Sequence, residues 1–491
     1  MSEEVSSSLE STAALNSTVD QGHKQLTGRI SLLELLSTVL AYSAPIAVVS
    51  GFIPFVIVFN GIGAPLIFVA TMILMLVFAV GFTKMTQYIV NPGAFYAYIT
   101  AGLGKVPGLG AAFLAIYGYL LLTFCTMPFL GINFRDLVHN TFYGPEIPWY
   151  FYALLCWAAC SVLSFLKIEL STKVLTTAMI LEVLIVVIFN ISVISHGGAQ
   201  GFNTEPFTWK AFTSGSVGLA LLFAVTVFIG FEATAVFRDE VKDPVKTVPR
   251  AAYLAVLFIG LFYALAAWIL ITAFGDNAAV EYANKSPADM FSVAMLRYVG
   301  QMGVDVTRVL LVTSLFASML SGWNIVARYL YTLSKDGVLP KSISAVHQKH
   351  NSPYIASIFV SALTLILVLA FILIKSDPVV IYGQVAGVGG FAIMLLMFIT
   401  SVSVFFFFIR SSIKSVSKFK SVVAPVVSSI GLLIILYLAI SHFDLLIGGG
   451  KMQAIILECI TFGVFILGSA VALYNKNRRP DVYRRIGGNR I

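Results

Sequence analysis

Charged residues are scarce in this chain, and their shortage narrows the range of functions. Asp, Glu, Lys and Arg make up 11% of the 491 residues, whereas hydrophobic residues make up 58%. A soluble domain carries about 25% charged and about 45–50% apolar residues, and a core of this size would need far more polar cover. These proportions exclude a soluble enzyme, a disordered scaffold and a nucleic-acid-binding protein, even though the net charge is +8.

Cysteine is the second shortage. The four cysteines lie inside apolar runs, and their spacing matches neither a disulfide framework nor a zinc site. Cys156 and Cys160 are one helical turn apart, but no His or acidic partner is near them, so we interpret them as small packing residues. The sequence also shows no His–Asp cluster or Ser–Lys dyad within its apolar runs that would indicate a catalytic site. We therefore expect no metal, no cofactor and no enzymatic activity.

Long apolar runs take up most of the chain instead. A helix that crosses a bilayer needs about 20 mainly apolar residues. A strand of a transmembrane barrel has only about ten residues, in which apolar and polar side chains alternate. The sequence therefore predicts an all-α membrane protein with about twelve spans. The expected spans are 31–59, 62–89, 108–132, 148–166, 172–195, 214–237, 251–274, 306–331, 353–374, 384–409, 422–441 and 452–474.

The distribution of Lys and Arg predicts the orientation, because these residues accumulate in cytoplasmic loops. With the N-terminus inside, all but seven of the 31 Lys and Arg residues fall on the cytoplasmic side. We therefore expect a multi-pass protein of the cell membrane, in contact with the lipid bilayer, with both termini cytoplasmic. The seven exceptions are Arg135, Lys210, Lys285, Arg297, Arg308, Lys375 and Lys451.

The two ends of the chain differ from the apolar middle. Residues 1–27 are rich in Ser and Thr and have neither a basic start nor an adjacent apolar stretch, so they predict a disordered cytosolic tail rather than a cleaved signal peptide. Residues 476–491 form a basic cytosolic tail that we expect to face anionic lipid.

Two spans contain interruptions. Pro45 stands at mid-depth in the first span, where it removes one backbone hydrogen bond and clashes with the carbonyl four residues back. In the sixth span, Gly230 precedes the ionisable side chain of Glu232. Polar groups freed at that depth need protein or a watery cavity around them, and a buried carboxyl usually faces the bundle interior. The alternative is that Pro45 merely kinks a helix and that Glu232 pairs with a neighbour.

The positions of the two interruptions favour a carrier. They correspond if residues 31–195 are repeated as residues 214–409, with two extra helices over 422–474. Paired interruptions at matching positions of two halves point to the binding site of a transporter. Five helices per repeat would also invert the second copy in the membrane. The pattern predicts a secondary transporter domain over residues 28–475.

Three motifs in order resemble those of the amino acid–polyamine–organocation (APC) superfamily. Residues 228–251 contain Gly230-Phe231-Glu232, Glu240-Val241-Lys242-Asp243-Pro244 and Val248-Pro249-Arg250-Ala251. These resemble the family's Gly-Phe-Glu break, Glu-Val-Lys-Asn-Pro and Ile-Pro-Arg-Ala. Residues 91–98 resemble its Pro-Gly-Gly-x-Tyr-x-Tyr segment, and residues 327–340 resemble its Ala-Arg…Arg-Asp-Gly-x-Leu-Pro run. The resemblance covers roughly residues 28–475.

The resemblance implies a leucine-transporter-type fold, a five-plus-five inverted repeat with discontinuous helices 1 and 6 that works by alternating access. It also implies that the substrate's α-carboxylate and α-amino groups dock on exposed backbone at the two breaks. Half-helix N-termini suit a carboxylate, and carbonyl-rich ends suit an ammonium. The implied substrate-binding residues are Ser43, Ala44, Pro45, Ile46 and Ala47 in the first span and Val227, Phe228, Ile229, Gly230 and Phe231 in the sixth, with Phe228 or Phe231 as an aromatic gate.

This sequence departs from the family pattern in two spans. The first span has Ser43 to Ala47 where the family commonly has Ile-Gly-x-Gly-Ile, so proline makes the break more than glycine does. In the fifth span, Glu182 stands near the position where many sodium-independent members carry a membrane-embedded lysine. A carboxyl there would hold a proton or pair with a cation, since burial favours its protonated form; the alternative is a solvated Glu182 one turn nearer the cytosol.

Three more residues complete the set of candidate coupling residues. Glu232 is expected to sense protons or to hold the break in shape. Ser318 and Ser321 in the eighth span offer hydroxyls to the region of Glu182, although Ser residues in membranes commonly bond to the backbone of their own helix.

The sequence thus predicts a secondary active transporter of amino acids or related amines, a proton-coupled symporter or an exchanger. With Glu182 and Glu232 deep in the membrane and no basic partner evident, a neutral or cationic substrate is favoured over a dianionic one. The alternatives are a sodium-independent carrier of another small organic solute, such as a nucleobase or an organocation, and a channel or transporter-like sensor.

Overall fold

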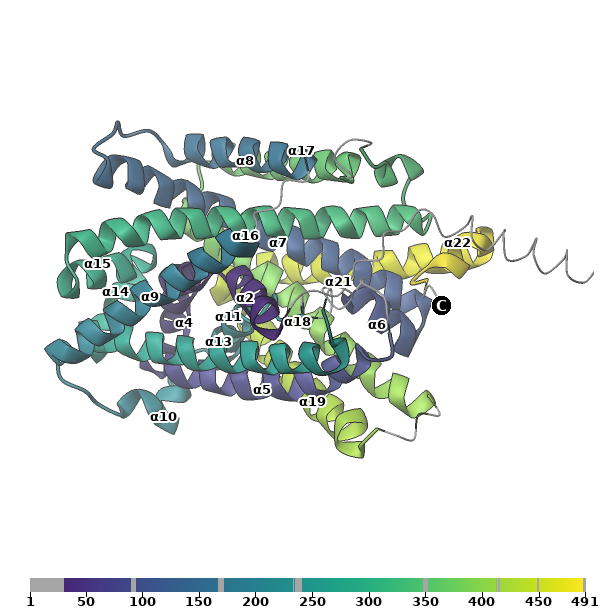
Figure 1. The fold of residues 1–491 in the computed structure, drawn as a ribbon, viewed down its shortest axis with the longest axis horizontal. Coiled ribbons are helices and arrows are strands. Elements are labelled where there is room, and N and C mark those ends of the chain that lie inside the picture. Colours follow the sequence, from purple (N-terminus) through teal and green to yellow (C-terminus); the bar gives the residue numbers. More distant parts are fainter. Residues whose placement is uncertain are drawn as a thin grey trace, which may run out of the picture.

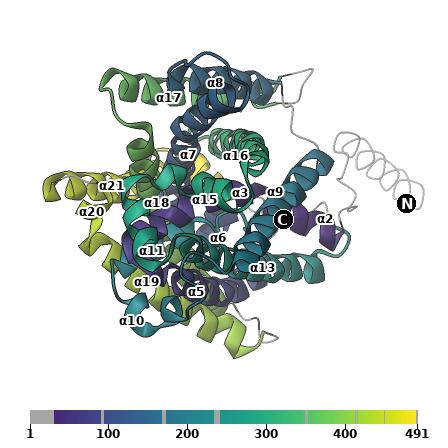
Figure 2. The same cartoon turned by 90° about the vertical axis from the view of Figure 1, so that its left-hand side faces the viewer.

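The computed structural model of the chain describes residues 31–89, 94–166, 172–232, 234, 241–347, 352–411, 413, 416–447 and 450–488. Over these residues the chain is helical and contains no β-strand. The long helices run roughly parallel to one another (Figure 1). Viewed along the bundle, α8 and α17 lie side by side at one edge and α5 lies toward the opposite one (Figure 2). The expected tail 1–27 lies outside the described residues.

The N-terminal half begins with an interrupted helix and continues with long ones. Its helices are α2 (Leu32–Tyr42), α3 (Pro45–Ala47), α4 (Ile53–Asn60), α5 (Ala64–Met85), α6 (Ala94–Leu103), α7 (Lys105–Asp136), α8 (Trp149–Phe165), α9 (Thr172–His196), α10 (Trp209–Phe212) and α11 (Val217–Thr226).

The C-terminal half contains the remaining long helices and several short ones. These are α13 (Pro244–Phe274), α14 (Asp276–Lys285), α15 (Met290–Tyr298), α16 (Gln301–Lys335), α17 (Tyr354–Leu373), α18 (Pro378–Arg410), α19 (Ala424–Ser441), α20 (Phe443–Ile447), α21 (Lys451–Arg478) and α22 (Pro480–Arg485).

Nine helical runs among the described residues are long and apolar enough to cross a membrane. Trp149–Phe165 and Val217–Thr226 are shorter apolar helices at the places of the expected fourth and sixth spans. In its described part the protein is helical, and its apolar helices make it a multi-pass membrane protein. The sequence missed the short helices α14 and α15 between the seventh and eighth spans, and the tenth helix begins at Pro378 rather than at residue 384.

Local capping sets where several long helices begin. The side chain of Asp377 accepts hydrogen bonds from the backbone N–H groups of Val379 and Val380 at 2.8 and 3.1 Å, and Pro378 occupies the first turn of α18. Asp243 caps α13 in the same way, with Pro244 in its first turn. An Asp followed by Pro is a strong signal for the start of a helix. The Asp side chain accepts hydrogen bonds from N–H groups of the first turn that have no partner within the helix, and proline has no N–H group that would need one.

Small residues let the central helices approach closely. A Cβ atom on Gly118 of α7 would lie 2.7 Å from Ile393 of α18, and one on Gly389 of α18 would lie 3.0 Å from Leu122 of α7. Membrane helices associate through such close packing because lipid is as apolar as their side chains, so the hydrophobic effect does little to bring them together. The fold therefore fixes α7 and α18 as a rigid pair beside the interrupted helices.

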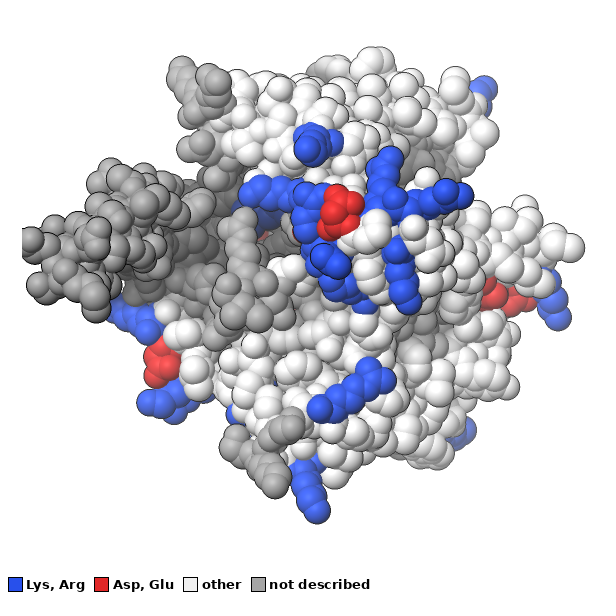
Figure 3. Space-filling view, turned by 90° about the vertical axis from the view of Figure 1, so that its right-hand side faces the viewer, with Lys and Arg blue, Asp and Glu red and all other residues white. Residues whose placement is uncertain are grey.

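The C-terminal segment folds back onto one end of the bundle, beside α6 and α16. The backbone N–H of Gly487 donates to the hydroxyl of Tyr96 at 2.6 Å, and that hydroxyl donates to Asp336 at 2.8 Å. Val482 and Ile486 are buried, whereas the arginines of α22 are exposed. On this end of the molecule Lys and Arg outnumber Asp and Glu (Figure 3).

Candidate functional site

The first interruption is a complete break in the helix. α2 ends at Tyr42, Ala44 takes a left-handed conformation with φ 48° and ψ 68°, and Pro45 opens the short helix α3. A π-helical turn, Val48–Phe52, then leads into α4. A left-handed alanine costs about 1–2 kcal/mol, and proline cannot donate a hydrogen bond. The residues around Pro45 therefore expose backbone polar groups inside the bundle.

The second interruption follows α11. Residues 227–232 form consecutive turns, and Gly230 has φ 113°, a conformation that other residues rarely adopt. Residues 235–240, which include Glu240, the first residue of the Glu-Val-Lys-Asp-Pro motif, lie outside the described residues. In the described part of the chain, regular helical hydrogen bonding thus stops at both positions where Pro45 and Gly230 predict an interruption.

Each break is bonded to one buried carboxylate. The backbone N–H of Ile46 donates to Glu182 of α9 at 3.2 Å, and the backbone N–H of Gly230 donates to Glu232 at 2.8 Å. Glu182 is 3% exposed and Glu232 is 5% exposed. Breaks in a membrane helix leave N–H groups without partners, and these two side chains satisfy one N–H group at each break.

Glu232 also links the second break to α7. Its second carboxylate oxygen accepts a hydrogen bond from the hydroxyl of Tyr119 at 2.6 Å. The ring of Tyr119 stacks on Tyr329 of α16, with ring centroids 6.0 Å apart. The break at Gly230 is therefore connected through two tyrosines to α16.

A cavity of about 100 Å³ lies between the two breaks. Six residues predicted from the sequence line it: Ser43, Ala44, Ala47, Val227, Ile229 and Ser318. The other predicted residues do not line it. Pro45, Ile46, Phe228, Gly230 and Phe231 are part of the breaks, Glu182 and Glu232 bond to them, and Ser321 is a half-buried residue of α16.

The predicted aromatic residues of the second break point elsewhere. Phe231 packs against Phe78 and Phe82 of α5, with ring centroids 6.0 and 5.6 Å apart. Phe228 is fully buried and outside the cavity lining. The aromatic side chains that line the cavity are those of Phe52, Tyr119 and Tyr382.

Two helix faces in the lining were missed. α7 contributes Tyr119, Leu122, Thr123, Cys125 and Thr126, and α16 contributes Leu315 and Gly322 beside Ser318. The spacing of Tyr119, Thr123 and Thr126 puts these polar side chains on one face of a helix. That polar stripe in an otherwise apolar span is the sequence signal by which the α7 wall could have been found.

Backbone atoms at the breaks remain without hydrogen bonds. Among the described residues, no partner is present for the N–H of Ala44 or for the carbonyls of Val227 and Ile229. All three residues line the cavity. A buried backbone group without a partner is unusual, so a donor at one break and two acceptors at the other are free for a ligand.

Aromatic rings close the cavity on one side. Phe223 of α11 contacts Phe52, Phe55 and Phe59, with ring centroids 5.9, 5.6 and 5.1 Å apart. Phe52 lines the central cavity, whereas Phe59 lines a second cavity of about 350 Å³, whose lining includes Asp276. The aromatic group formed by these four phenylalanines therefore separates the two cavities.

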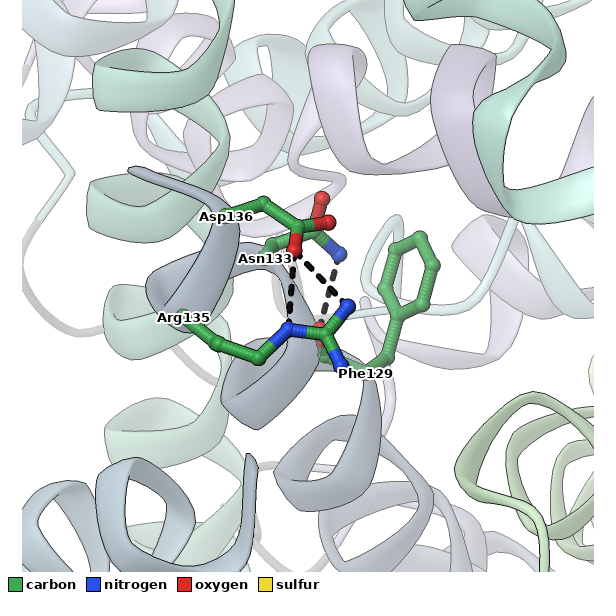
Figure 4. Close-up of polar contacts among 4 residues, drawn as sticks. All are labelled: Phe129, Asn133, Arg135 and Asp136. Atoms are coloured by element: carbon green, nitrogen blue, oxygen red, sulfur yellow. Dashed lines mark hydrogen bonds and ion pairs between the residues drawn. The ribbon is translucent and has the colours of Figure 1, made fainter. Parts of the chain in front are cut away.

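The end of α7 contacts this aromatic group through Tyr382. Phe129 stacks on Tyr382 with ring centroids 4.3 Å apart, and Tyr382 contacts Phe52 and Phe55 with ring centroids 5.6 and 5.9 Å apart. The side chain of Asn133 donates to the carbonyl of Phe129 at 2.7 Å, and Arg135 pairs with Asp136 at 2.8 Å on the next turn (Figure 4). These contacts order the last turns of α7 behind the ring of Phe129.

Ser314 of α16 is buried beside Glu182. It is one helical turn before Ser318, on the same face of α16. Its hydroxyl adds a polar group from a third helix to the contact between Glu182 and the first break. No group of three His, Cys, Asp or Glu side chains that could hold a metal is present in the described part of the chain.

Comparison with known proteins gives a consistent result. The family model described as "Amino acid permease" matches residues 32–465. The chain is 25% identical to the branched-chain amino acid permease BcaP of Bacillus subtilis over 329 residues, 62% of this chain and 67% of that protein. It is 24% identical to the low-affinity putrescine importer PlaP of Escherichia coli over 378 residues, 75% of this chain and 80% of that protein. It is 29% identical to the lysine-specific permease LysP of Lactococcus lactis over 179 residues, 36% of this chain and 34% of that protein.

Proposed function

The chain belongs to the amino acid permease family, and is thus a transporter of amino acids or amines rather than an enzyme; from this we propose that it binds its substrate between the two helix breaks and moves it by alternating access. The observation that carries the proposal is the pair of breaks facing one cavity. In this reading the N–H of Ala44 receives the substrate carboxylate, and the carbonyls of Val227 and Ile229 receive the α-ammonium.

The expected architecture supports this cycle. We take the interrupted first helix (α2 to α4), α5, the eight other long helical runs and the two shorter apolar helices as the twelve expected spans of a five-plus-five inverted repeat with two added helices. The excess of Lys and Arg near α6 and α22 favours that end as the cytoplasmic one, with both termini on the cytoplasmic side of the cell membrane. The aromatic group around Phe223 would then close the outer side of the cavity.

Protons are the coupling ion in this proposal. Glu182 lies where a charge would act directly on the first break, because its carboxylate accepts from the N–H of Ile46. Protonation would weaken that hydrogen bond and release the first break, whereas ionisation would strengthen it. Ser314 and Ser318 extend the same polar region onto α16. Glu232 acts on the second break in the same manner through Gly230.

Counterflow in proteoliposomes tests the carrier mechanism. Vesicles containing the purified protein are loaded with an unlabelled amino acid mixture and given labelled amino acids outside. A carrier accumulates label faster when substrate is present on the opposite side, whereas a channel or a non-transporting sensor gives no such acceleration. Labelled nucleobases in a parallel arm would identify the alternative solute class if they alone exchanged.

A further inference from the structure

Among the residues that the structure describes, none with a charged side chain lines the central cavity. Its described lining contains no Asp, Glu, Lys, Arg or His. Away from the breaks, the apolar part of its walls includes Leu122 and Cys125 of α7, Leu315 of α16 and Val48 of the π-helical turn. Building on the proposed function, we propose that the substrate is an amino acid with a small uncharged side chain, and that cationic amino acids and polyamines are rejected.

The buried carboxylates of Glu182 and Glu232, at the two breaks, already have hydrogen-bond partners within the protein. Glu182 accepts the N–H of Ile46, and Glu232 accepts both the N–H of Gly230 and the hydroxyl of Tyr119. Neither carboxylate lines the cavity. A distal ammonium of a bound lysine or putrescine would therefore be buried without a counter-charge, and an unpaired buried charge is strongly unfavourable.

Most hydroxyls in the lining are also bonded. Thr123, Thr126 and Thr226 donate to backbone carbonyls of their own helices at 2.7, 3.0 and 2.8 Å. Ser43 shares a hydrogen bond of 2.9 Å with Tyr263.

Only Ser318 and Tyr382 have lining hydroxyls without a partner among the described residues. The side-chain end of the site thus offers two hydroxyls and apolar contacts, which suit a methyl or hydroxymethyl group.

The volume of the cavity sets an upper size. At about 100 Å³ it is smaller than the ~150 Å³ apolar cavity that admits benzene. Opposite walls already touch: a Cβ on Gly322 of α16 would lie 2.3 Å from the hydroxyl of Thr123 of α7. Aromatic side chains are therefore excluded on size, whereas cationic ones are excluded on charge.

A substrate panel in the counterflow assay tests the selectivity. Labelled alanine and serine are expected to exchange, whereas lysine, arginine, putrescine and phenylalanine exchange at least about 100-fold more slowly, equivalent to about 2.7 kcal/mol. If lysine, putrescine or phenylalanine exchanges as fast as alanine, the selectivity proposal is wrong while the carrier function stands. If no amino acid or amine exchanges, the proposed function fails and this inference fails with it.

A matched pair of variants at Thr126 tests the charge argument directly. Thr126→Asp places a carboxylate in the lining, and Thr126→Asn places an uncharged group of the same size there. Lysine or putrescine counterflow is expected to appear in the Asp variant and not in the Asn variant. Thermal melting of both variants first confirms that they fold. If a folded Asp variant gains no cation exchange, the missing counter-charge is not what rejects cations, and the proposal falls.

Discussion

The backbone N–H of Ile46 donates to the carboxylate of Glu182 at 3.2 Å, across 136 residues of sequence. The bond joins α9 to the break between α2 and α3, so a single ionisable side chain holds the interrupted first span. Because Glu182 is buried, its charge state and the geometry of the break depend on each other. Most of what we expect of ion coupling follows from this contact.

The first prediction concerns Glu182→Gln. The amide keeps an oxygen that accepts from Ile46 but can neither ionise nor bind a proton, so the break is retained while the titration is lost. We expect uptake driven by a pH gradient to disappear and exchange at equal pH to remain. Both are measured in the same proteoliposomes, with Glu205→Gln, an exposed carboxyl outside the site, as the control. If uptake by the variant keeps its full dependence on the proton gradient, Glu182 does not couple transport to protons.

The second prediction concerns Tyr119→Phe. The change removes the 2.6 Å hydrogen bond to Glu232 and leaves that buried carboxylate with fewer donors. Hydrogen bonds to charged groups contribute about 1.5–3 kcal/mol, so the variant should unfold at a lower temperature and exchange substrate more slowly. Tyr117→Phe, on the same helix but outside the cavity lining, should leave exchange unchanged. If the two variants exchange substrate at the same rate, Tyr119 has no role in the site.

The sequence predicts the breaks but not their partners. Proline and glycine are local signals, so Pro45 and Gly230 could be placed without any tertiary information. The contacts of Glu182 with Ile46 and of Tyr119 with Glu232 depend on helix packing across more than a hundred residues, which one sequence does not contain. The direction of Phe231, toward α5 instead of the cavity, depends on packing in the same way.

The third prediction is a pH dependence of stability at the end of α16. Burial raises the pKa of the Asp336 carboxyl above its ordinary value, although the hydrogen bond from Tyr96 lowers it. The folded protein therefore binds this proton more tightly than the unfolded chain, and the associated stability is present at low pH and lost as the pH rises through the raised pKa.

Asp336→Asn removes this titration, and its amide oxygen can still accept from Tyr96. The melting temperature of the unmodified protein should fall more steeply than that of the variant as the pH rises from about 4, near the ordinary pKa of Asp. Tryptophan fluorescence in detergent measures both curves. Parallel curves would mean that Asp336 titrates alike in the folded and unfolded chains.

The fourth prediction tests whether the second break contacts substrate. Gly230 has φ 113° and adjoins Ile229 in the cavity lining, so Gly230→Leu strains the break and fills space beside the free carbonyl of Ile229. Gly104→Leu imposes similar strain at φ 99°, but a Cβ there would meet no atom within 4 Å. We expect only the Gly230 variant to lose the rise in melting temperature that alanine produces, because a ligand stabilises the folded state in proportion to its binding. An unchanged alanine-induced shift in Gly230→Leu would place the substrate away from this break, since the control accounts for strain alone.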